Sequence, residues 1–266
     1  MKKVIRRLLN TVLLSFPSVR CDLLGYSSHS VDTSWILSTL IKCKKNGMEV
    51  VFAYSQGSCP EHFLEQFKDA GIKVFHGVDS HFMQRANAPV VLTASSGLPK
   101  SFFSRKYCHY RVHMPHSISS LHMIYPKDAF DGYNVLFAVG PHHEKEFHAL
   151  TKLNGLKERA VYKCGYSKAG IKKSDYVYNP QHPPHVLLAP SWGKGNILET
   201  IGTDLVSLLL DKGYKVSVRP HPAFFIDGHE VLDNLKSLSA KETLFRIEDS
   251  RESGEAIYDA DIMISD

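Results

Sequence analysis

Short apolar runs alternate with longer amphipathic stretches along most of this chain of 266 residues. The short runs are rich in β-branched and aromatic residues, which is typical of strands. They predict strands at Asp22–Tyr26, Glu49–Tyr54, Ile72–Phe75, Ala88–Ala94, Tyr133–Val139, Ala160–Cys164, Val186–Ala189, Lys215–Val218, Thr243–Ile247 and Asp261–Ser265. The amphipathic stretches, with apolar residues at helical spacing, predict helices at Asp32–Lys45, Pro60–Ala70, Pro141–Leu153, Ile197–Asp211, Glu230–Leu238 and Gly254–Asp259. This alternation predicts parallel sheets covered by helices on both faces.

A proline-rich segment at residues 175–185 interrupts the alternation. It has few side chains suited to a core, and therefore predicts a linker. The linker separates a predicted acceptor-side domain at 21–174 from a predicted donor-binding domain at 186–266. The predicted fold class is α/β, with two Rossmann-like domains that face each other across a cleft. In such sheets, ligands bind outside the carboxyl ends of the strands.

The two ends of the chain carry separate expectations. Residues 1–20 predict a basic amphipathic helix, because Lys2, Lys3, Arg6 and Arg7 precede an apolar run. That run is too short to span a bilayer, and no small-residue cleavage site follows it. Two interpretations remain open: the helix lies on the inner membrane surface, or it packs on the first domain. At the other end, the chain stops in a predicted buried strand, so we expect the C-terminal domain to be truncated.

Composition narrows the class of protein. Hydrophobic residues make up 43% of the chain and charged residues 22%, which is ordinary for a globular protein. A net charge of +5 favours anionic partners such as nucleotides, phosphopolymers or an anionic membrane surface. The five cysteines form no CxxC pair, which fits a reduced, cytoplasmic protein. Although 15 histidines are present, no HExxH pattern occurs, and we expect neither a metal nor a cofactor.

The segment Arg111–Ser117 places two histidines, an arginine and a serine where a strand passes into a loop. A histidine there can act as a general base on a hydroxyl, because its pKa lies near neutral pH. The alternative is that His113 and His116 only pack and form hydrogen bonds within the loop.

Three further segments follow predicted strands. The segment 189–196 carries Ser191 and Lys194 between a strand and a helix, where backbone N–H groups and the helix dipole favour phosphate, although the spacing of a P-loop is absent. Prolines on both sides of His221 hold it and Arg219 rigidly, which suits a diphosphate leaving group. Ser265 and Asp266 lie at the end of the last predicted strand, where a serine hydroxyl can bond phosphate oxygens. Plain structural turns are the alternative at each position.

These segments, taken in order, resemble the CDP-glycerol glycerophosphotransferase family, whose members build teichoic-acid-type and some capsular polymers. The typical motifs of that family are WHG with a following lysine, GYPR, APTW, R-x-HP and TDYSS. The corresponding segments here are Pro115-His116-Ser117 with Lys127 downstream, Gly165-Tyr166-Ser167-Lys168, Ala189-Pro190-Ser191-Trp192, Arg219-Pro220-His221-Pro222 and Ile264-Ser265-Asp266. The resemblance covers residues 105 to 266. Its strongest matches are APSW and RPHP, whereas PHS lacks the tryptophan and glycine of WHG.

The resemblance implies a GT-B-like fold and the transfer of glycerol phosphate from CDP-glycerol to a hydroxyl of a cell-envelope polymer or glycolipid, with release of CMP. It implies His116 and His221 as catalytic residues. Donor phosphate binding would fall to Arg219, Ser191, Lys194, Ser265 and Asp266, and further phosphate contacts to Lys127 and Lys168. No metal and no nucleic acid are implied. The basic N-terminal helix fits a lipid-linked acceptor and peripheral association with the cytoplasmic face of the membrane.

Two alternative hypotheses about the function remain. A GT-B glycosyltransferase that uses a nucleotide sugar would share the fold and the basic cleft. A truncated, non-catalytic remnant would bind nucleotide or membrane without turnover, and the incomplete WHG motif favours it. Turnover of a donor separates the remnant from both enzymes, and the identity of that donor separates the enzymes from each other.

Overall fold

A computed structural model describes residues 17–29, 32–55, 59–166, 182–221, 224–227, 230–248, 257 and 259–266. The chain divides into two compact units, Met1–Gly170 and Ile171–Asp266. Most of the predicted N-terminal helix, of the predicted linker and of the predicted helix at 254–259 lies outside the described residues, and so does Lys168. In the part that is described, no helix is long and apolar enough to cross a membrane.

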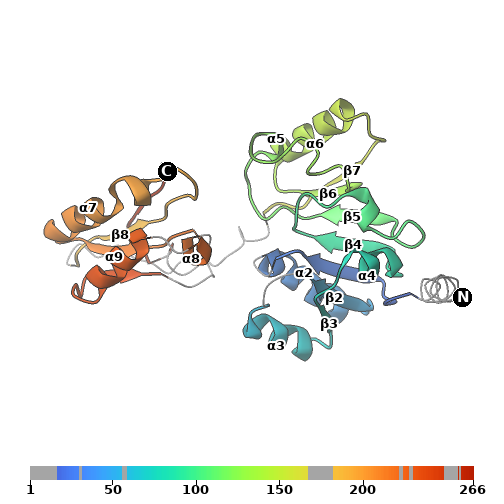
Figure 1. Cartoon of the computed structure of the whole chain (residues 1–266), viewed down its shortest axis with the longest axis horizontal. Helices are drawn as coiled ribbons and strands as arrows, with labels where there is room; N and C mark the ends of the chain where they lie inside the picture. Colours follow the sequence, from blue (N-terminus) through green and yellow to red (C-terminus); the bar gives the residue numbers. More distant parts are fainter. Residues whose placement is uncertain are drawn as a thin grey trace, which may run out of the picture. The chain divides into compact units, whose positions relative to one another are not determined.

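The first unit is built on a seven-stranded sheet in which every neighbouring pair is parallel (Figure 1). Its strand order is β3-β2-β1-β4-β5-β6-β7. The strands are β1 (Leu23–Ser27), β2 (Val50–Tyr54), β3 (Lys73–His76), β4 (Val90–Thr93), β5 (Tyr110–His113), β6 (Val135–Ala138) and β7 (Ala160–Lys163). The chain runs outward from β1 to β3, then returns to β4 on the other side of β1. The point between β1 and β4 is the topological switch point of a doubly wound sheet.

Helices cover both faces of this sheet. They are α2 (Thr33–Lys45), α3 (Glu61–Asp69), α4 (Ser80–Arg85), α5 (Leu121–Ile124) and α6 (Pro141–Leu153), with a 3₁₀ turn η2 (Lys100–Phe102). Successive residues of β1 alternate between two core layers, because side chains of a strand point to opposite faces. Leu23 packs with Ile36 and Leu40 of α2, whereas Leu24 packs in the layer that contains Phe147 of α6.

Arg159 fixes the end of α6 against the sheet. Its guanidinium lies 3.7 Å from the centre of the Phe147 ring and donates hydrogen bonds to the carbonyls of Phe130 at 2.7 Å and Phe147 at 3.1 Å. Its Nε also donates to Oγ1 of Thr151 at 2.7 Å. Burial lowers the pKa of Arg159 to about 10, which leaves the group charged at neutral pH. The buried cation is therefore satisfied by carbonyl oxygens and a ring face.

The second unit holds a four-stranded parallel sheet in the order β10-β9-β8-β11 (Figure 1). The strands are β8 (His185–Leu188), β9 (Lys215–Val218), β10 (Phe245–Ile247) and β11 (Ile262–Ile264), and the helices are α7 (Ile197–Asp211), α8 (Phe224–Asp227) and α9 (Glu230–Ser239). Val206, Val216 and Leu235 lie at the centre of its core. This order repeats that of β3-β2-β1-β4, so both units have a Rossmann-like arrangement.

The described strands agree closely with those predicted from the apolar runs. The helices α6, α7 and α9 also begin where the pattern predicts, at Pro141, Ile197 and Glu230. The pattern does not predict α4 and α5, which are too short for a helical period to appear. The strand β5 lies at the start of the segment that we expected to pass from strand to loop.

The buried His113 on β5 makes the free energy of unfolding of the first unit depend on pH. Its side chain is 2% exposed and packs edge-on against Phe130 at 5.0 Å. Burial, with a smaller contribution from His116 and His143, lowers the pKa of His113 from 6.5 to about 3. Below about pH 6.5 the unfolded chain binds a proton at this residue that the folded chain excludes. The free energy of unfolding should therefore fall as the pH falls from 6.5 towards 3, and should not depend on His113 above 6.5.

We predict that His113→Phe makes the first unit less sensitive to acid. Between pH 6 and 5, its free energy of unfolding should fall by about 1 kcal/mol less than that of the parent. Urea unfolding followed by Trp35 fluorescence in a Trp192→Phe background measures the first unit. The exposed His148, changed to Gln, serves as the control. Equal pH dependence in the parent and His113→Phe would contradict the prediction.

Candidate functional site

The carboxyl ends of β1 and β4 hold a buried carboxylate. Asp32 precedes α2 and is 8% exposed. Its Oδ2 accepts a hydrogen bond from Oγ of Ser95 at 2.6 Å, and Ser95 Oγ accepts one from the backbone N–H of Ser28 at 2.9 Å. Among the described residues, no lysine, arginine or histidine forms an ion pair with Asp32. The switch point thus presents an acceptor group without a counter-cation, next to backbone and hydroxyl groups.

His116 lies at the same edge of the sheet, in the loop after β5. Its Nδ1 is 3.3 Å from the carbonyl oxygen of Ala94, and its Nε2 is 3.3 Å from the hydroxyl of Tyr125. A carbonyl oxygen can only accept, so Nδ1 must carry the proton and donate it. In the neutral imidazole, Nε2 then keeps its lone pair and accepts a hydrogen bond from Tyr125. These two partners favour the neutral tautomer in which Nε2 is the basic nitrogen of His116.

Aromatic rings surround this imidazole. Trp35 of α2 lies 6.3 Å from His116 between ring centres, and the Tyr125 ring meets it edge-on at the same distance. Tyr166, which follows β7, lies 5.5 Å from Trp35. Burial, followed by the negative charge of Asp32, raises the pKa of Tyr125, so its hydroxyl stays protonated at neutral pH. We call Asp32, Ser95, His116 and Tyr125 the switch-point cluster.

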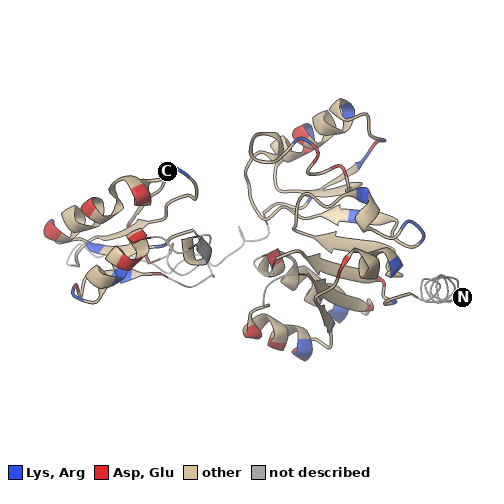
Figure 2. Cartoon of the chain, in the orientation of Figure 1, with Lys and Arg blue, Asp and Glu red and all other residues tan. Residues whose placement is uncertain are grey.

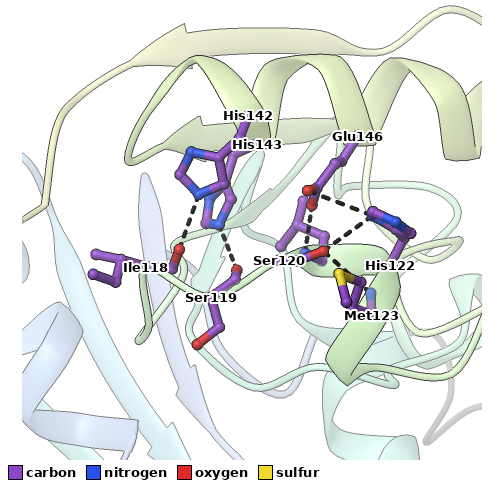
Figure 3. Close-up of polar contacts among 9 residues, drawn as sticks. Ile118, Ser119, Ser120, His122, Met123, His142, His143 and Glu146 are labelled. Atoms are coloured by element: carbon purple, nitrogen blue, oxygen red, sulfur yellow. Dashed lines mark hydrogen bonds and ion pairs between the residues drawn. The ribbon is translucent and has the colours of Figure 1, made fainter.

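The loop that carries His116 is fixed by α6 (Figure 3). Nε2 of His142 is 2.9 Å from the carbonyl oxygen of Ile118, and Nε2 of His143 is 2.8 Å from that of Ser119. One turn further on, a carboxylate oxygen of Glu146 accepts the backbone N–H of Leu121 at 2.5 Å. Both imidazoles must donate to these carbonyls. His142 and His143 therefore serve as anchors of the loop.

The remaining candidates of the first unit lie differently. His113 is buried in the core beneath the cluster, and its Nδ1 lacks a hydrogen-bond partner in the described structure. Lys127 is exposed in the turn after α5, where its carbonyl accepts a hydrogen bond from Nδ2 of Asn154 at 3.0 Å. Lys168 lies outside the described residues. Among those that are described, no group of three His, Cys, Asp or Glu side chains is placed to hold a metal.

In the second unit, the end of β11 meets the loop between β8 and α7. The carboxylate of Asp266 accepts hydrogen bonds from the backbone N–H of Ser191 at 2.6 Å and from that of Ile197 at 2.5 Å. These bonds lower the pKa of Asp266 to about 2, so the group is ionised at neutral pH. The amides that point to this position therefore do bind an oxyanion, and here the oxyanion belongs to the chain itself.

Two glycines and an asparagine shape that loop. Gly193 and Gly195 have φ of 116° and 83°, a region that favours glycine. Oδ1 of Asn196 caps α7 by accepting from the N–H groups of Leu198 at 3.0 Å and Glu199 at 3.1 Å. Lys194 is exposed in this loop and forms no hydrogen bond or ion pair with the described residues.

Arg219 and His221 follow β9 at the same edge of the second sheet. The N–H of Arg219 donates to the carbonyl of Leu188 at 2.8 Å, which holds the turn against β8. Burial lowers the pKa of Arg219 while the nearby Glu248 opposes that shift. His221 is exposed, and its ring lies 6.3 Å from that of Trp192, which is 58% exposed. A cation, an imidazole and an indole thus lie near one another beside the amides of the β8–α7 loop.

The structure therefore gathers the predicted residues into two groups. Ser191, Arg219, His221 and Asp266 share the carboxyl edge of the second sheet, and His116 lies at the carboxyl edge of the first. Sequence reasoning missed Asp32, Ser95 and Tyr125. Ligands in such sheets bind at the topological switch point, next to the end of the first strand. The polar residues that follow the first predicted strand include Asp32, so this rule could have identified it from the sequence.

Comparison with known proteins supports the fold. No family model matches the sequence, and no curated protein matches it. The UDP-GlcNAc 2-epimerase from Neisseria meningitidis, solved with UDP-GlcNAc bound, is 9% identical over 93% of this chain and 77% of that chain, with a TM-score of 0.58. A UDP-GlcNAc 2-epimerase from Methanocaldococcus jannaschii, in complex with UDP-GlcNAc and UDP, is 12% identical. The match covers 93% of this chain and 78% of that chain, with a TM-score of 0.53. A glycosyltransferase from Rickettsia africae is 12% identical. The match covers 92% of this chain and 72% of that chain, with a TM-score of 0.50.

These likenesses show the fold alone, because the identities are so low. They are to glycosyltransferase-type proteins of the GT-B class, and they confirm the predicted α/β fold with Rossmann-like sheets.

We predict that the loop after His116 depends on its anchors in α6. His143→Ala removes the hydrogen bond to Ser119, so backbone amides of residues 117–124 should exchange with deuterium about tenfold faster or more. Hydrogen exchange followed by mass spectrometry measures this. His148→Ala, an exposed position on the same helix, should leave the rates unchanged. If both variants exchange at the rate of the parent, the anchoring role is wrong.

Proposed function

We propose that this protein is a transferase that uses a nucleoside-diphosphate donor. The observation that carries the proposal is the carboxyl edge of the second sheet, where Arg219 and His221 follow β9 and His221 lies next to Trp192 of the β8–α7 loop. A guanidinium and an imidazole suit a diphosphate, and they stabilise the charge that grows on a phosphate leaving group. The amides of Ser191 and Ile197 bind the Asp266 carboxylate and hold that loop in shape. Two of the solved structures with this fold hold UDP-GlcNAc, which supports a donor of the same chemical class.

The finer proposal is that the donor is CDP-glycerol and the group transferred is glycerol phosphate. It is supported by where the resembling motifs lie. His116 comes after β5, Tyr166 after β7, Trp192 after β8, His221 after β9 and Asp266 after β11. Each motif follows a strand of a parallel sheet, which is where ligand-binding residues gather in this class of fold. Their order along the chain is that of the glycerophosphotransferase motifs.

In this reaction, a hydroxyl of the acceptor attacks the β-phosphorus of CDP-glycerol. The new P–O bond forms as the bond from that phosphorus to the bridging oxygen breaks, and CMP leaves. The acceptor proton passes to Nε2 of His116. The lone pair of Nε2 can accept this proton when the acceptor hydroxyl replaces the hydroxyl of Tyr125 as its hydrogen-bond partner. Arg219 and His221 stabilise the negative charge on the departing CMP. Catalysis of this kind rests mainly on positioning and charge stabilisation.

Asp32 fits the acceptor side of the same reaction. A buried carboxylate with a single hydroxyl donor retains unused lone pairs. Polyols and sugars offer hydroxyl donors, and a carboxylate in a low-dielectric site binds them strongly. We infer that Asp32 and Ser95 orient a hydroxyl-rich acceptor beside His116. The acceptor is then a cell-envelope polymer or a glycolipid, and Lys127, exposed in the turn after α5, is the candidate contact for its phosphates.

The second unit has a matching division of roles. Lys194 extends from the β8–α7 loop as a cation for the donor phosphates, and Ser265 supplies a hydroxyl, whereas the hydroxyl of Ser191 bonds to Asp266. Asp266 keeps the loop in shape through its two amide bonds rather than by touching phosphate, because two anions at one position repel each other. The reaction would take place in the cytoplasm, with the protein peripheral to the membrane that holds a lipid-linked acceptor.

A glycosyltransferase that uses a nucleotide sugar is the second candidate. The observation that favours it is the fold shared with a glycosyltransferase and with epimerases that hold UDP-GlcNAc. The two reactions differ in the atom attacked, which is phosphorus in one and the anomeric carbon in the other. They therefore release different nucleotides, CMP from CDP-glycerol and UDP from a UDP-sugar.

We predict that the full protein, given a lipid-extract acceptor, releases CMP from CDP-glycerol and leaves UDP-GlcNAc intact. His221→Ala and His116→Ala should each lower the rate by about 10²–10⁴-fold, because each removes a group that acts in the transition state. His148→Ala is the matched control. Nucleotide release measured by chromatography gives the rates. Release of UDP with no release of CMP would replace this proposal with the glycosyltransferase, and no release from either donor would favour the non-catalytic remnant.

A further inference from the structure

The connection between β4 and β5 covers a cavity at the opposite end of the first sheet from His116. Because β4 and β5 are parallel, the chain must return along the sheet between them. It does so here with only the short turn η2, where a longer helix is usual. The cavity has a volume of about 660 Å³. It is lined by Lys100, Ser101, Phe103, Ser104, Arg105, Cys108 and Arg111.

The lining holds three cations and no carboxylate. Figure 2 shows basic positions on the loop that precedes β5, and residues 95–109 contain neither Asp nor Glu. Lys100, Arg105 and Arg111 form no ion pair within the described part of the chain. The only other ionisable group of the lining is the Cys108 thiol, and burial raises its pKa to about 11. The protein therefore supplies no negative charge to this cavity.

Arg111 is the most constrained of these cations. Its Nε donates to the carbonyl of Gly132 at 2.6 Å, which fixes the guanidinium plane at the cavity wall. Its side chain is partly buried, and burial lowers its pKa. A guanidinium that has lost part of its hydration without a counter-ion is destabilised, and two further cations around the same cavity add repulsion. An anion bound in the cavity would pair with the guanidinium and would offset the repulsion among the three cations.

The shape of the donor set points to phosphate. A guanidinium offers two parallel N–H donors, which match two oxygens of one phosphate. The ammonium of Lys100 adds a point charge, and the hydroxyls of Ser101 and Ser104 add neutral donors. Ser104 is 3% exposed and accepts the N–H of Tyr107 at 3.3 Å, which leaves its own hydrogen to donate.

We propose that this cavity binds the phosphate of a phosphodiester, at a site of the first unit that is separate from the switch-point cluster. The inference does not depend on the identity of the donor. Two sources share the chemistry: a phosphodiester-linked soluble chain and the headgroup of an anionic lipid. Either would hold the first unit to a phosphate-rich polymer or surface while leaving the carboxyl edge of its sheet open.

The test compares the full chain with the double variant Lys100→Gln/Arg105→Gln. Both side chains are exposed, so their loss should not disturb folding, whereas Arg111 is kept because it also anchors Gly132. Lys106→Gln is the matched control, since Lys106 is exposed and adjacent to Arg105 but does not line the cavity. Calorimetric titration with glycerophosphoglycerol measures binding of a soluble phosphodiester. Co-sedimentation with phosphatidylglycerol vesicles, against phosphatidylcholine vesicles, measures binding of the lipid source.

We expect the double variant to bind at least one of the two anionic probes about tenfold more weakly or worse, with Lys106→Gln close to the parent. Loss confined to the soluble diester identifies a polymer phosphate, and loss confined to phosphatidylglycerol vesicles identifies a lipid headgroup. Equal affinity of the double variant and the parent for both probes would overturn the proposal. So would a parent protein that binds neither probe, or an equal loss in Lys106→Gln, which would indicate a general effect of charge.

Discussion

Parallel pairing of the strands is the constraint on which the rest of this structure depends. In a parallel sheet every strand leaves at the same edge, so segments that are far apart in the sequence finish side by side. The pairing of β1 with β4 brings Asp32 and Ser95 together across 63 positions of sequence. The pairing of β8 with β11 likewise brings Asp266 to the amides of the β8–α7 loop.

The two edges have different chemistry because their polar groups are held differently. At the first, a carbonyl oxygen fixes the tautomer of His116 and thereby leaves a basic nitrogen facing a tyrosine hydroxyl. At the second, the backbone amides of the β8–α7 loop hold the Asp266 carboxylate, and the guanidinium of Arg219 and the imidazole of His221 are the side chains suited to an oxyanion. The proposed transfer from an activated phosphate requires both a base and groups that stabilise an anion.

Much of the fold can be predicted from the sequence because its central strands, such as β1, β2 and β8, are fully buried and therefore almost continuously apolar. The helices α6 and α7 are predicted well because Pro141 and Asn196 mark their starts. The site is predicted only in part. His116, Arg219 and His221 follow strands directly, whereas the partnership of Asp32 with Ser95 depends on strand order, which the local pattern does not contain. For the same reason, the use of His142 and His143 as loop anchors is visible only once α6 is placed against the loop.

The central claim is that the carboxyl edge of the second sheet binds a nucleoside diphosphate. Trp192 lies beside His221 and reports on that edge directly, once Trp35 is replaced by Phe to leave it as the sole tryptophan. Titration of this variant with CDP should change the Trp192 fluorescence saturably, and Arg219→Gln should weaken the binding about tenfold or more. No change with CDP or UDP at millimolar concentration would contradict the assignment of this edge as the donor site.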